Sequence, residues 1–235
     1  MDGTGFFLTS NIDLSMFDLS RKIIFTHPQK CAGTTIEGLF GWNPPKYKGT
    51  DRPKYIEYFN KWKHASLDEH LNELRLIGED TLNYFIFSCV RNPWDRAVSW
   101  YFHSKIKPII KFKRYNPGKE IPQKMRAIQN YSFEEFILDD YERVKNGGFN
   151  ALSTRPFIFS VTGAKPDLII RHENYTEGLH AAAKKYGLDA STAKPLNANV
   201  RPNGGGYKEY YLNSELISVV AKMGADSISD FGYKF

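Results

Sequence analysis

The sequence has 235 residues, of which 41% are hydrophobic and 25% charged, as in soluble globular proteins. No run approaches the roughly 20 apolar residues of a membrane-spanning helix, and the first 20 residues do not resemble a signal peptide. We therefore expect no membrane span and a cytoplasmic location. The two cysteines, Cys31 and Cys89, are too few for a disulfide framework and are expected to be free thiols.

Four apolar, strand-like runs recur along the chain, at residues 22–26, 84–90, 156–161 and 167–171. Helical patterns lie between them, and this alternation predicts an α/β fold with a P-loop-like parallel sheet flanked by helices on both faces. We expect a single domain over residues 21–235, preceded by an N-terminal segment of residues 1–20.

The first strand-like run leads into the loop Lys30-Cys31-Ala32-Gly33-Thr34-Thr35. Gly33 permits a tight turn, and residues 34–40 read as a helix that Gly41 ends. The free N–H groups of such a helix start form a seat for phosphate, to which Lys30 adds a positive charge. A Walker A loop places its lysine after the last glycine, whereas Lys30 precedes Gly33. The loop therefore predicts phosphate binding without ATPase activity.

Further along the chain, Ser66-Leu67-Asp68-Glu69 is a capping box that predicts a helix ending before Gly78. A second capping box, Ser132-Phe133-Glu134-Glu135, predicts a helix that ends at Gly147. Two more helices are expected over residues 174–187 and 214–223.

A second anion seat is predicted after the strand-like run that ends at Val90. Asn92 and Pro93 suit the N-cap and first position of a helix, so Arg91 lies at the carboxyl end of a strand beside a helix start. Ser99, two turns along that helix, can point the same way. Because Lys30 and Arg91 both follow strands of one parallel sheet, we expect them at one edge, where they bind a ligand with two separated anionic groups. The alternative is that Arg91 only pairs with Asp95.

The net charge of +6 arises from one segment, residues 104–131, which contains eight basic residues and one acidic residue. This Pro- and Gly-containing basic insertion is either a solvated loop or a docking surface for an anionic partner.

Together these motifs resemble the paired donor-binding motifs of carbohydrate sulfotransferases that use 3′-phosphoadenosine-5′-phosphosulfate (PAPS). The resemblance is to the branch with the chondroitin/dermatan-type and heparan 2-O-type enzymes and their small bacterial relatives. The matching segments are Lys30–Thr35, Val90–Arg96 with Ser99, Lys63–Ser66, Asp167–Asn174 and Asp230–Phe235. Cys31 stands where the family more often has threonine. The resemblance implies the sulfotransferase fold, PAPS as donor and 3′-phosphoadenosine-5′-phosphate (PAP) as product.

The resemblance also implies the roles of individual residues. The 5′-phosphosulfate is assigned to the donor loop, residues Lys30, Cys31, Ala32, Gly33, Thr34 and Thr35, and the 3′-phosphate to Arg91 and Ser99. Arg201 and Tyr207 are expected to close over the nucleotide from a glycine-containing loop that also carries Asn199. Arg171 and Glu173 are expected to pair with each other and brace the site. No metal is expected.

The acceptor hydroxyl must lose its proton, and His64 is the preferred general base. It precedes a capped helix and follows Lys63, and both features disfavour the imidazolium form. The other histidines are rivals, namely His27, His70, His103, His172 and His180. His103 is the most serious of them because it lies one turn beyond Ser99.

The preferred function is sulfuryl transfer from PAPS to a hydroxyl of a carbohydrate acceptor, and the basic segment favours an anionic glycan. The alternatives are a catalytically inactive nucleotide-binding module and a P-loop kinase. The position of the lysine and the lack of a convincing magnesium carboxylate disfavour the kinase. We expect no nucleic-acid partner, because aromatic residues are not interleaved with the charges.

Overall fold

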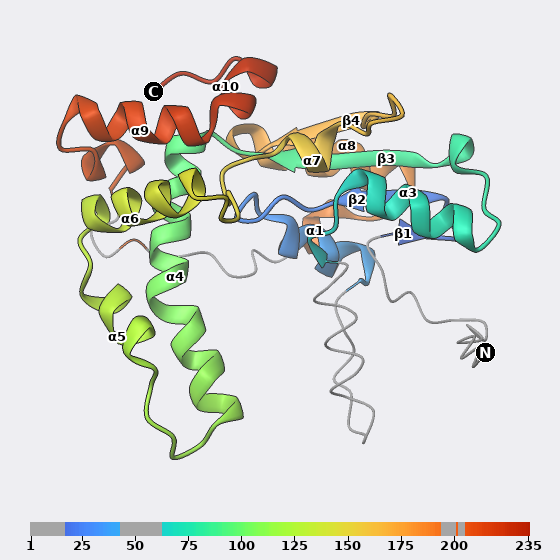
Figure 1. Cartoon of the computed structure of the whole chain (residues 1–235). Coiled ribbons are helices and arrows are strands. Elements are labelled where there is room, and N and C mark those ends of the chain that lie inside the picture. Colours follow the sequence, from blue (N-terminus) through green and yellow to red (C-terminus); the bar gives the residue numbers. More distant parts are fainter. Residues whose placement is uncertain (1–16, 43–62, 194–200, 202–204) are drawn as a thin grey trace.

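A four-stranded sheet forms the centre of the fold (Figure 1). The computed structural model of the chain describes residues 17–42, 63–193, 201 and 205–235. The strands follow the order β1 (Phe17–Asp18), β2 (Ile23–Thr26), β3 (Phe85–Val90) and β4 (Leu168–Arg171). β2, β3 and β4 are parallel, which confirms the predicted sheet, while β1 is antiparallel to β2 and lies within the segment expected to precede the domain.

Alternate side chains of the strands are buried on opposite faces of the sheet, as the two-residue period of a strand requires. Ile23, Phe25 and Phe87 pack with α1 (Gly33–Phe40) and α8 (Tyr175–Lys185). Ile24 and Ile86 pack on the other face with α3 (Leu67–Leu76). Helices thus cover both faces of the sheet, as predicted.

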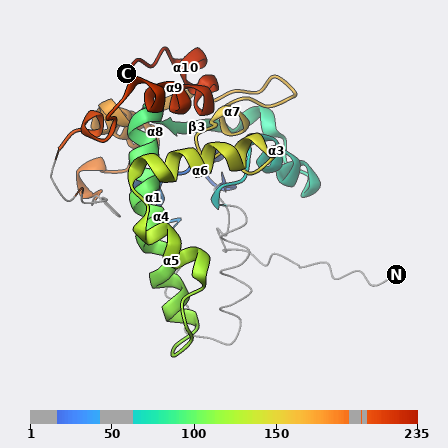
Figure 2. The same cartoon turned by 60° about the vertical axis from the view of Figure 1, so that its left-hand side comes forward.

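A second group of helices packs beyond the end of β3, around a separate cluster of buried side chains. It consists of α4 (Pro93–Tyr115), α6 (Phe133–Lys145) and α9 (Ser214–Met223), with α10 (Ala225–Phe231) next to α9. Figure 2 shows α6 crossing α4 in this layer. The described residues also form four short 3-10 turns, at Thr81–Asn83, His172–Asn174, Ala190–Thr192 and Tyr207–Tyr210. Both predicted capping boxes are present, at Ser66 and Ser132.

The strand expected at residues 156–161 is wrong, because this stretch contains the short helix α7 (Arg155–Ile158). Pro156 lies in its first turn, where the missing N–H of proline costs no hydrogen bond. The side chain of Asp226 accepts hydrogen bonds from the backbone N–H groups of Thr154 and Arg155 at 2.8 and 2.9 Å. These bonds hold the start of the turn, and the buried side chains of Phe157 and Ile158 explain the apolar run.

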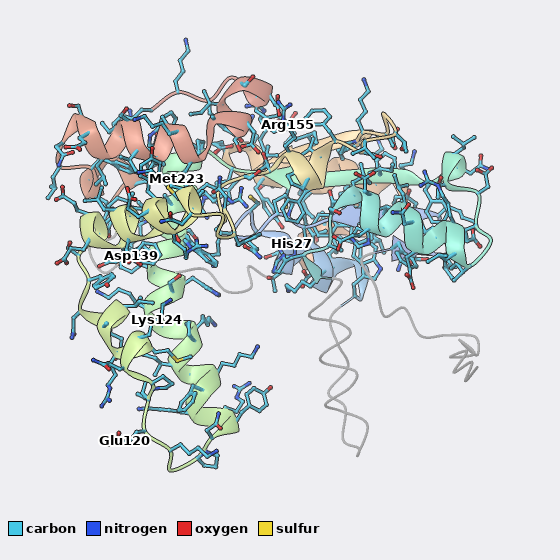
Figure 3. All side chains as sticks on the ribbon, in the orientation of Figure 1. His27, Glu120, Lys124, Asp139, Arg155 and Met223 are labelled. Atoms are coloured by element: carbon cyan, nitrogen blue, oxygen red, sulfur yellow. The ribbon has the colours of Figure 1, made fainter. Side chains whose placement is uncertain are left out.

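The basic segment is mostly helical rather than a loop. α4, which has 23 residues, extends into it as far as Tyr115, and after a short non-helical connection α5 (Gln123–Asn130) packs back against α4 (Figure 1). The buried side chain of Ile109 lies within this stretch, while most of the cations point to solvent. We call α4 from Ser104 onward together with α5 the basic arm. Figure 3 labels Lys124 on this arm and Glu120 in the connection between α4 and α5, both well away from the sheet.

Within the part of the chain that the structure describes, no helix is long and apolar enough to cross a membrane.

Candidate active site

A cavity of about 1170 Å³ lies at the carboxyl ends of β2 and β3. Its walls contain most of the residues that the sequence pointed to, namely Lys30, Ala32, Gly33, Thr34, Thr35, His64, Arg91, Ser99 and Arg201. Parallel strands end at the same edge of a sheet, which explains how segments far apart in the sequence meet here. The side chain of Cys31 is instead buried in the core, and Tyr207 is not among the described residues that line this cavity.

The donor loop, residues Lys30–Thr35, has an unusual backbone. Lys30 and Ala32 have φ angles of 64° and 68°, in the left-handed region that residues other than glycine rarely adopt. Such outliers cluster at ligand-binding sites. Gly33 follows Ala32 and begins α1, and a Cβ atom there would overlap the ring of His27. Glycine is therefore required at this position because the loop packs directly on a side chain.

Lys30 extends into the cavity and meets His103, with Nζ 3.3 Å from Nδ1 of the histidine. The pKa of Lys30 is lowered to about 8, mainly by burial and also by the positive charges of Arg91 and Lys107. The ammonium group is thus held in a site where it is poorly solvated and repelled by its neighbours. A bound anion would relieve both effects.

Arg91 joins the two predicted anion seats. Its Nη1 donates to the carbonyl oxygen of Lys30 at 3.1 Å, and its Nε pairs with Asp95 at 2.7 Å. Arg201 pairs with the other carboxylate oxygen of Asp95. Arg91 therefore pairs with Asp95 and also lines the cavity.

The charged side chains among the described lining residues of the cavity are all cations. Five of the described lining residues are cationic, namely Lys30, Lys63, Arg91, Lys107 and Arg201, and none carries a carboxylate. Cations concentrated in a concave site raise the local concentration of anionic ligands. The arrangement is suited to a ligand with more than one anionic group.

His64 is held in one tautomer. Its Nδ1 lies 2.7 Å from the carbonyl oxygen of His27, which can only accept, so Nδ1 carries the proton and Nε2 keeps its lone pair. Burial lowers the pKa of His64 to about 3, and the charges of His27 and Lys63 act in the same direction. The imidazole is therefore neutral at pH 7, as a general base must be, with burial as the main cause rather than Lys63.

A buried network supports His64, and the sequence analysis missed it. Glu37 accepts from His27 Nδ1 at 2.5 Å and pairs with Lys63 Nζ at 2.5 Å. Burial alone would raise the pKa of Glu37, but the bonds and charges of His27 and Lys63 lower it overall. His27 thus contacts Gly33 with its ring and His64 with its carbonyl. No local pattern indicates this role, because the three partners come from separate parts of the chain.

Of the remaining histidines, His103, His172 and His180 also line the cavity. His103 accepts from Lys30 and stacks on Trp100, with ring centroids 5.7 Å apart. His172 lies 4.0 Å from Asp95, and His180 is exposed on α8, where its Nδ1 bonds to a backbone carbonyl. His70 is a buried residue of α3 and does not line the cavity. Of these, His103 is the one that shares the cavity with a direct contact to Lys30.

The predicted pair of Arg171 and Glu173 is wrong. Glu173 accepts from the backbone N–H of Asn92 at 2.7 Å and from the hydroxyl of Tyr233 at 3.1 Å. Arg171 donates instead to the carbonyl oxygen of Phe231. β4 ends at Arg171, and Glu173 lies in the 3-10 turn that follows it, so the two side chains do not share a strand face. Glu173 still braces the start of α4 but does so without Arg171.

Two other predicted residues lie outside the cavity wall. Tyr207 accepts a long hydrogen bond from the Asn92 side chain at 3.5 Å and packs on Phe235. Cys31 contacts the carbonyl oxygen of Gln29 through its thiol at 3.6 Å, so only its backbone belongs to the loop surface. Asn199, which shares the predicted closing loop, lies outside the described residues.

The far wall of the cavity was not predicted from the sequence. It comes from α8 and the 3-10 turn after it, and includes Tyr175, Leu179 and Ala190. The hydroxyl of Tyr175 donates to the carbonyl oxygen of Ala32 at 3.3 Å, which fixes the donor loop to α8. These residues carry no charge and read as an ordinary helical core face in the sequence.

The chain was compared with known structures, curated proteins and family profiles. A crystal structure of a sulfotransferase from Alicyclobacillus acidocaldarius is similar at 15% identity over 91% of this chain and 87% of that one, with a TM-score of 0.33. No curated protein matches the sequence. The profile of the sulfotransferase family matches residues 15–209, most of the chain. The chain therefore belongs to the sulfotransferase family and is a PAPS-dependent transferase.

Proposed function

We propose that this protein transfers the sulfuryl group of PAPS to a hydroxyl group of a carbohydrate acceptor, with PAP as product and His64 as general base. The observation that carries the proposal is the cavity itself, whose described walls combine five cations with a neutral histidine and contain no carboxylate. A kinase that binds a magnesium nucleotide needs carboxylate ligands for the metal, and the described walls offer none.

The two anion seats fit the two ends of the donor. Lys30, Gly33 and the hydroxyls of Thr34 and Thr35 surround the start of α1 and would hold the 5′-phosphosulfate. Arg91 and Ser99 come from the next strand and its helix and would hold the 3′-phosphate, with Arg201 alongside. The uncharged wall of Leu179 and Ala190 offers the apolar surface that an adenine base needs.

The reaction is a single displacement at sulfur. The acceptor oxygen forms the new S–O bond while the S–O bond to the 5′-phosphate breaks, and the acceptor proton passes to Nε2 of His64. Negative charge develops on the departing phosphate oxygen. Lys30 and the N–H groups at the start of α1 are placed to stabilise this charge.

An anionic acceptor would find a continuous positive track on the basic arm. Lys107 lines the cavity, and Lys111 and Arg114 follow it at spacings of four and three residues, on the same face of α4. These side chains are exposed. A polyanion bound along this face would lead from the arm into the cavity.

Transfer to an acceptor is tested directly with radiolabelled PAPS and a panel of sulfated and unsulfated glycans. Labelled product with at least one glycan is expected. Tight binding of PAP without turnover on any acceptor would favour the inactive nucleotide-binding module instead.

The double variant Lys111→Ala/Arg114→Ala is expected to raise KM for an anionic glycan by about 3- to 10-fold at low salt, with kcat little changed. The effect should shrink at higher ionic strength because the charges are exposed. The matched control is Lys184→Ala/Lys222→Ala, which removes two exposed cations outside the arm. An equal change in both variants, or no change in either, would exclude the arm as the docking surface.

The expected pH dependence of kcat/KM follows from the lowered pKa values of Lys30 and His64. Lys30 must be charged to act, and since its pKa is about 8, kcat/KM for PAPS is expected to fall as the pH rises through 8. His64 must be neutral, and since its pKa is about 3, no loss is expected down to about pH 5. The expected profile is a plateau from pH 5 to 7.5 with an alkaline limb. An acidic limb near pH 6.5 would show that the base has an ordinary histidine pKa.

A further inference from the structure

A second cavity, of about 360 Å³, adjoins the first, and His64 is the one described residue that lines both. One wall is the start of α3, with Ser66 and Glu69. The opposite wall comes from the connection between α6 and α7, with Phe149, Asn150, Ser153 and Phe157. A histidine between two cavities can take a proton from a ligand in one while the reacting partner lies in the other.

The wall formed by the α6–α7 connection is firmly anchored. One carboxylate oxygen of Asp226 accepts from the Ser153 hydroxyl at 2.6 Å and from two successive backbone N–H groups. The Asn150 side chain donates to the carbonyl oxygen of Met223 at 2.8 Å. Figure 3 labels Met223 and Arg155 near these anchor points. The cavity is therefore part of the fixed structure, since its wall bonds to both α9 and α10.

Arg96 ties this wall to the donor loop. Its guanidinium is buried, with Nε donating to the carbonyl oxygen of Gln29 at 2.7 Å and Nη1 to that of Leu152 at 3.2 Å. Gln29 immediately precedes Lys30, and Leu152 lies inside the α6–α7 connection. One buried side chain thus bonds both to the residue before the donor loop and to the wall of the second cavity.

Cations line the first cavity, whereas hydrogen-bond acceptors line the second. No described residue that lines the second cavity is a lysine or arginine. The Ser66 hydroxyl donates to the Glu69 carboxylate at 2.9 Å, and the Ser153 hydroxyl donates to Asp226. With their hydrogens used in this way, the Ser153 hydroxyl oxygen and the Glu69 carboxylate remain as acceptors, and the Ser66 hydroxyl oxygen, which already accepts from the Glu69 N–H, keeps one lone pair. Such a site suits a ligand rich in hydroxyl donors and disfavours an anion.

Phe149 supplies an aromatic surface at this cavity. Its side chain is 54% exposed although the surrounding backbone is firmly anchored, whereas Phe157 beside it is 6% exposed. An exposed aromatic ring on a rigid support, next to several acceptor oxygens, offers both an apolar face and polar partners to a ring-shaped ligand.

We propose that the second cavity is the acceptor subsite and that it binds an uncharged pyranose unit, stacked on Phe149 with its hydroxyls directed to Ser66, Glu69 and Ser153. The inference rests on the proposed function, since His64 is its link to the donor cavity. It also adds to that function: the unit that receives the sulfuryl group is neutral, and any anionic groups of the acceptor lie outside this subsite, toward the basic arm.

Binding is measured without turnover, by saturation-transfer NMR on the PAP-bound protein with methyl glucoside and methyl glucuronide as probes. The neutral glucoside is expected to bind more tightly than the glucuronide. Phe149→Ala should weaken glucoside binding about tenfold, while Phe149→Trp should retain it. Phe159→Ala is the matched control, since Phe159 is also exposed but does not line the cavity. The affinity for PAP should stay unchanged in all three variants.

Tighter binding of the glucuronide, or of phenol, than of the glucoside would overturn the proposal, as would equal effects of Phe149→Ala and Phe159→Ala. The test of the acceptor subsite and the test of the proposed function give results that can be told apart. Sulfation of glycans with no loss of glucoside binding in Phe149→Ala would overturn the subsite alone. The expected binding pattern in a protein that transfers no sulfuryl group would overturn the function and leave the subsite in place.

Discussion

Replacement of Lys30 by alanine is expected to reduce kcat for sulfuryl transfer by about 100- to 1000-fold, the usual cost of removing one donor that stabilises transition-state charge. Lys30 reaches the cavity from the donor loop, and its ammonium group is poorly solvated there, as its lowered pKa of about 8 indicates. A charge held in this way interacts strongly with an oxygen that becomes negative during the reaction, because little water screens it.

The test compares single-turnover rates and PAP binding in the same variant. The dissociation constant of PAP is expected to rise by only about tenfold, because Arg91 and the N–H groups of α1 still hold the nucleotide. Lys107→Ala is the control, since Lys107 is a second cation of the same cavity but lies on α4. Comparable losses of kcat in the two variants would mean that the cavity acts through its overall positive potential rather than through Lys30.

The parts of the fold that the sequence predicted are those with strong local signals. The runs that became β2, β3 and β4 are continuous and apolar, and the capping boxes at Ser66 and Ser132 contain all the atoms they need within four residues. The stretch at residues 156–161 was misread because its apolar side chains face a core that other segments supply. Asp226, 70 residues further on, holds it as a helical turn.

The residues of the candidate site that the sequence predicted also follow strong local signals. Lys30 and Arg91 were found because each directly follows a buried strand, and parallel strands bring their ends together. The network of His27, Glu37 and Lys63 could not be found in this way, because its bonds join a strand end, a helix and a separate segment. The basic arm was recognised by its charge, but its helical structure was not, since its Pro and Gly residues suggested a loop.

Among the histidines that line the first cavity, His64 and His103 are the two candidates for the general base. The Nδ1 of His103 accepts a hydrogen bond from Lys30, so its lone pair is already engaged. The Nε2 of His64 keeps its lone pair because the Nδ1 proton is donated to the carbonyl of His27. His64 also adjoins both cavities, whereas His103 lines only the first among the described residues. His64 therefore has the geometry of a base between donor and acceptor.

His64→Ala is expected to lower kcat by about 100- to 10,000-fold, the range for loss of a general base, and to leave PAP binding unchanged in calorimetry. His103→Ala is the matched control and should retain most of the transfer activity. Because the truncation leaves an imidazole-sized space open to two cavities, added imidazole should restore part of the activity to His64→Ala. Rescue should follow the neutral form of imidazole and so increase as the pH rises through the pKa of free imidazole, which lies near that of a histidine side chain. Full activity in His64→Ala would exclude His64 as the base. A larger loss in His103→Ala would assign the proton transfer to His103, whose side chain reaches the same cavity.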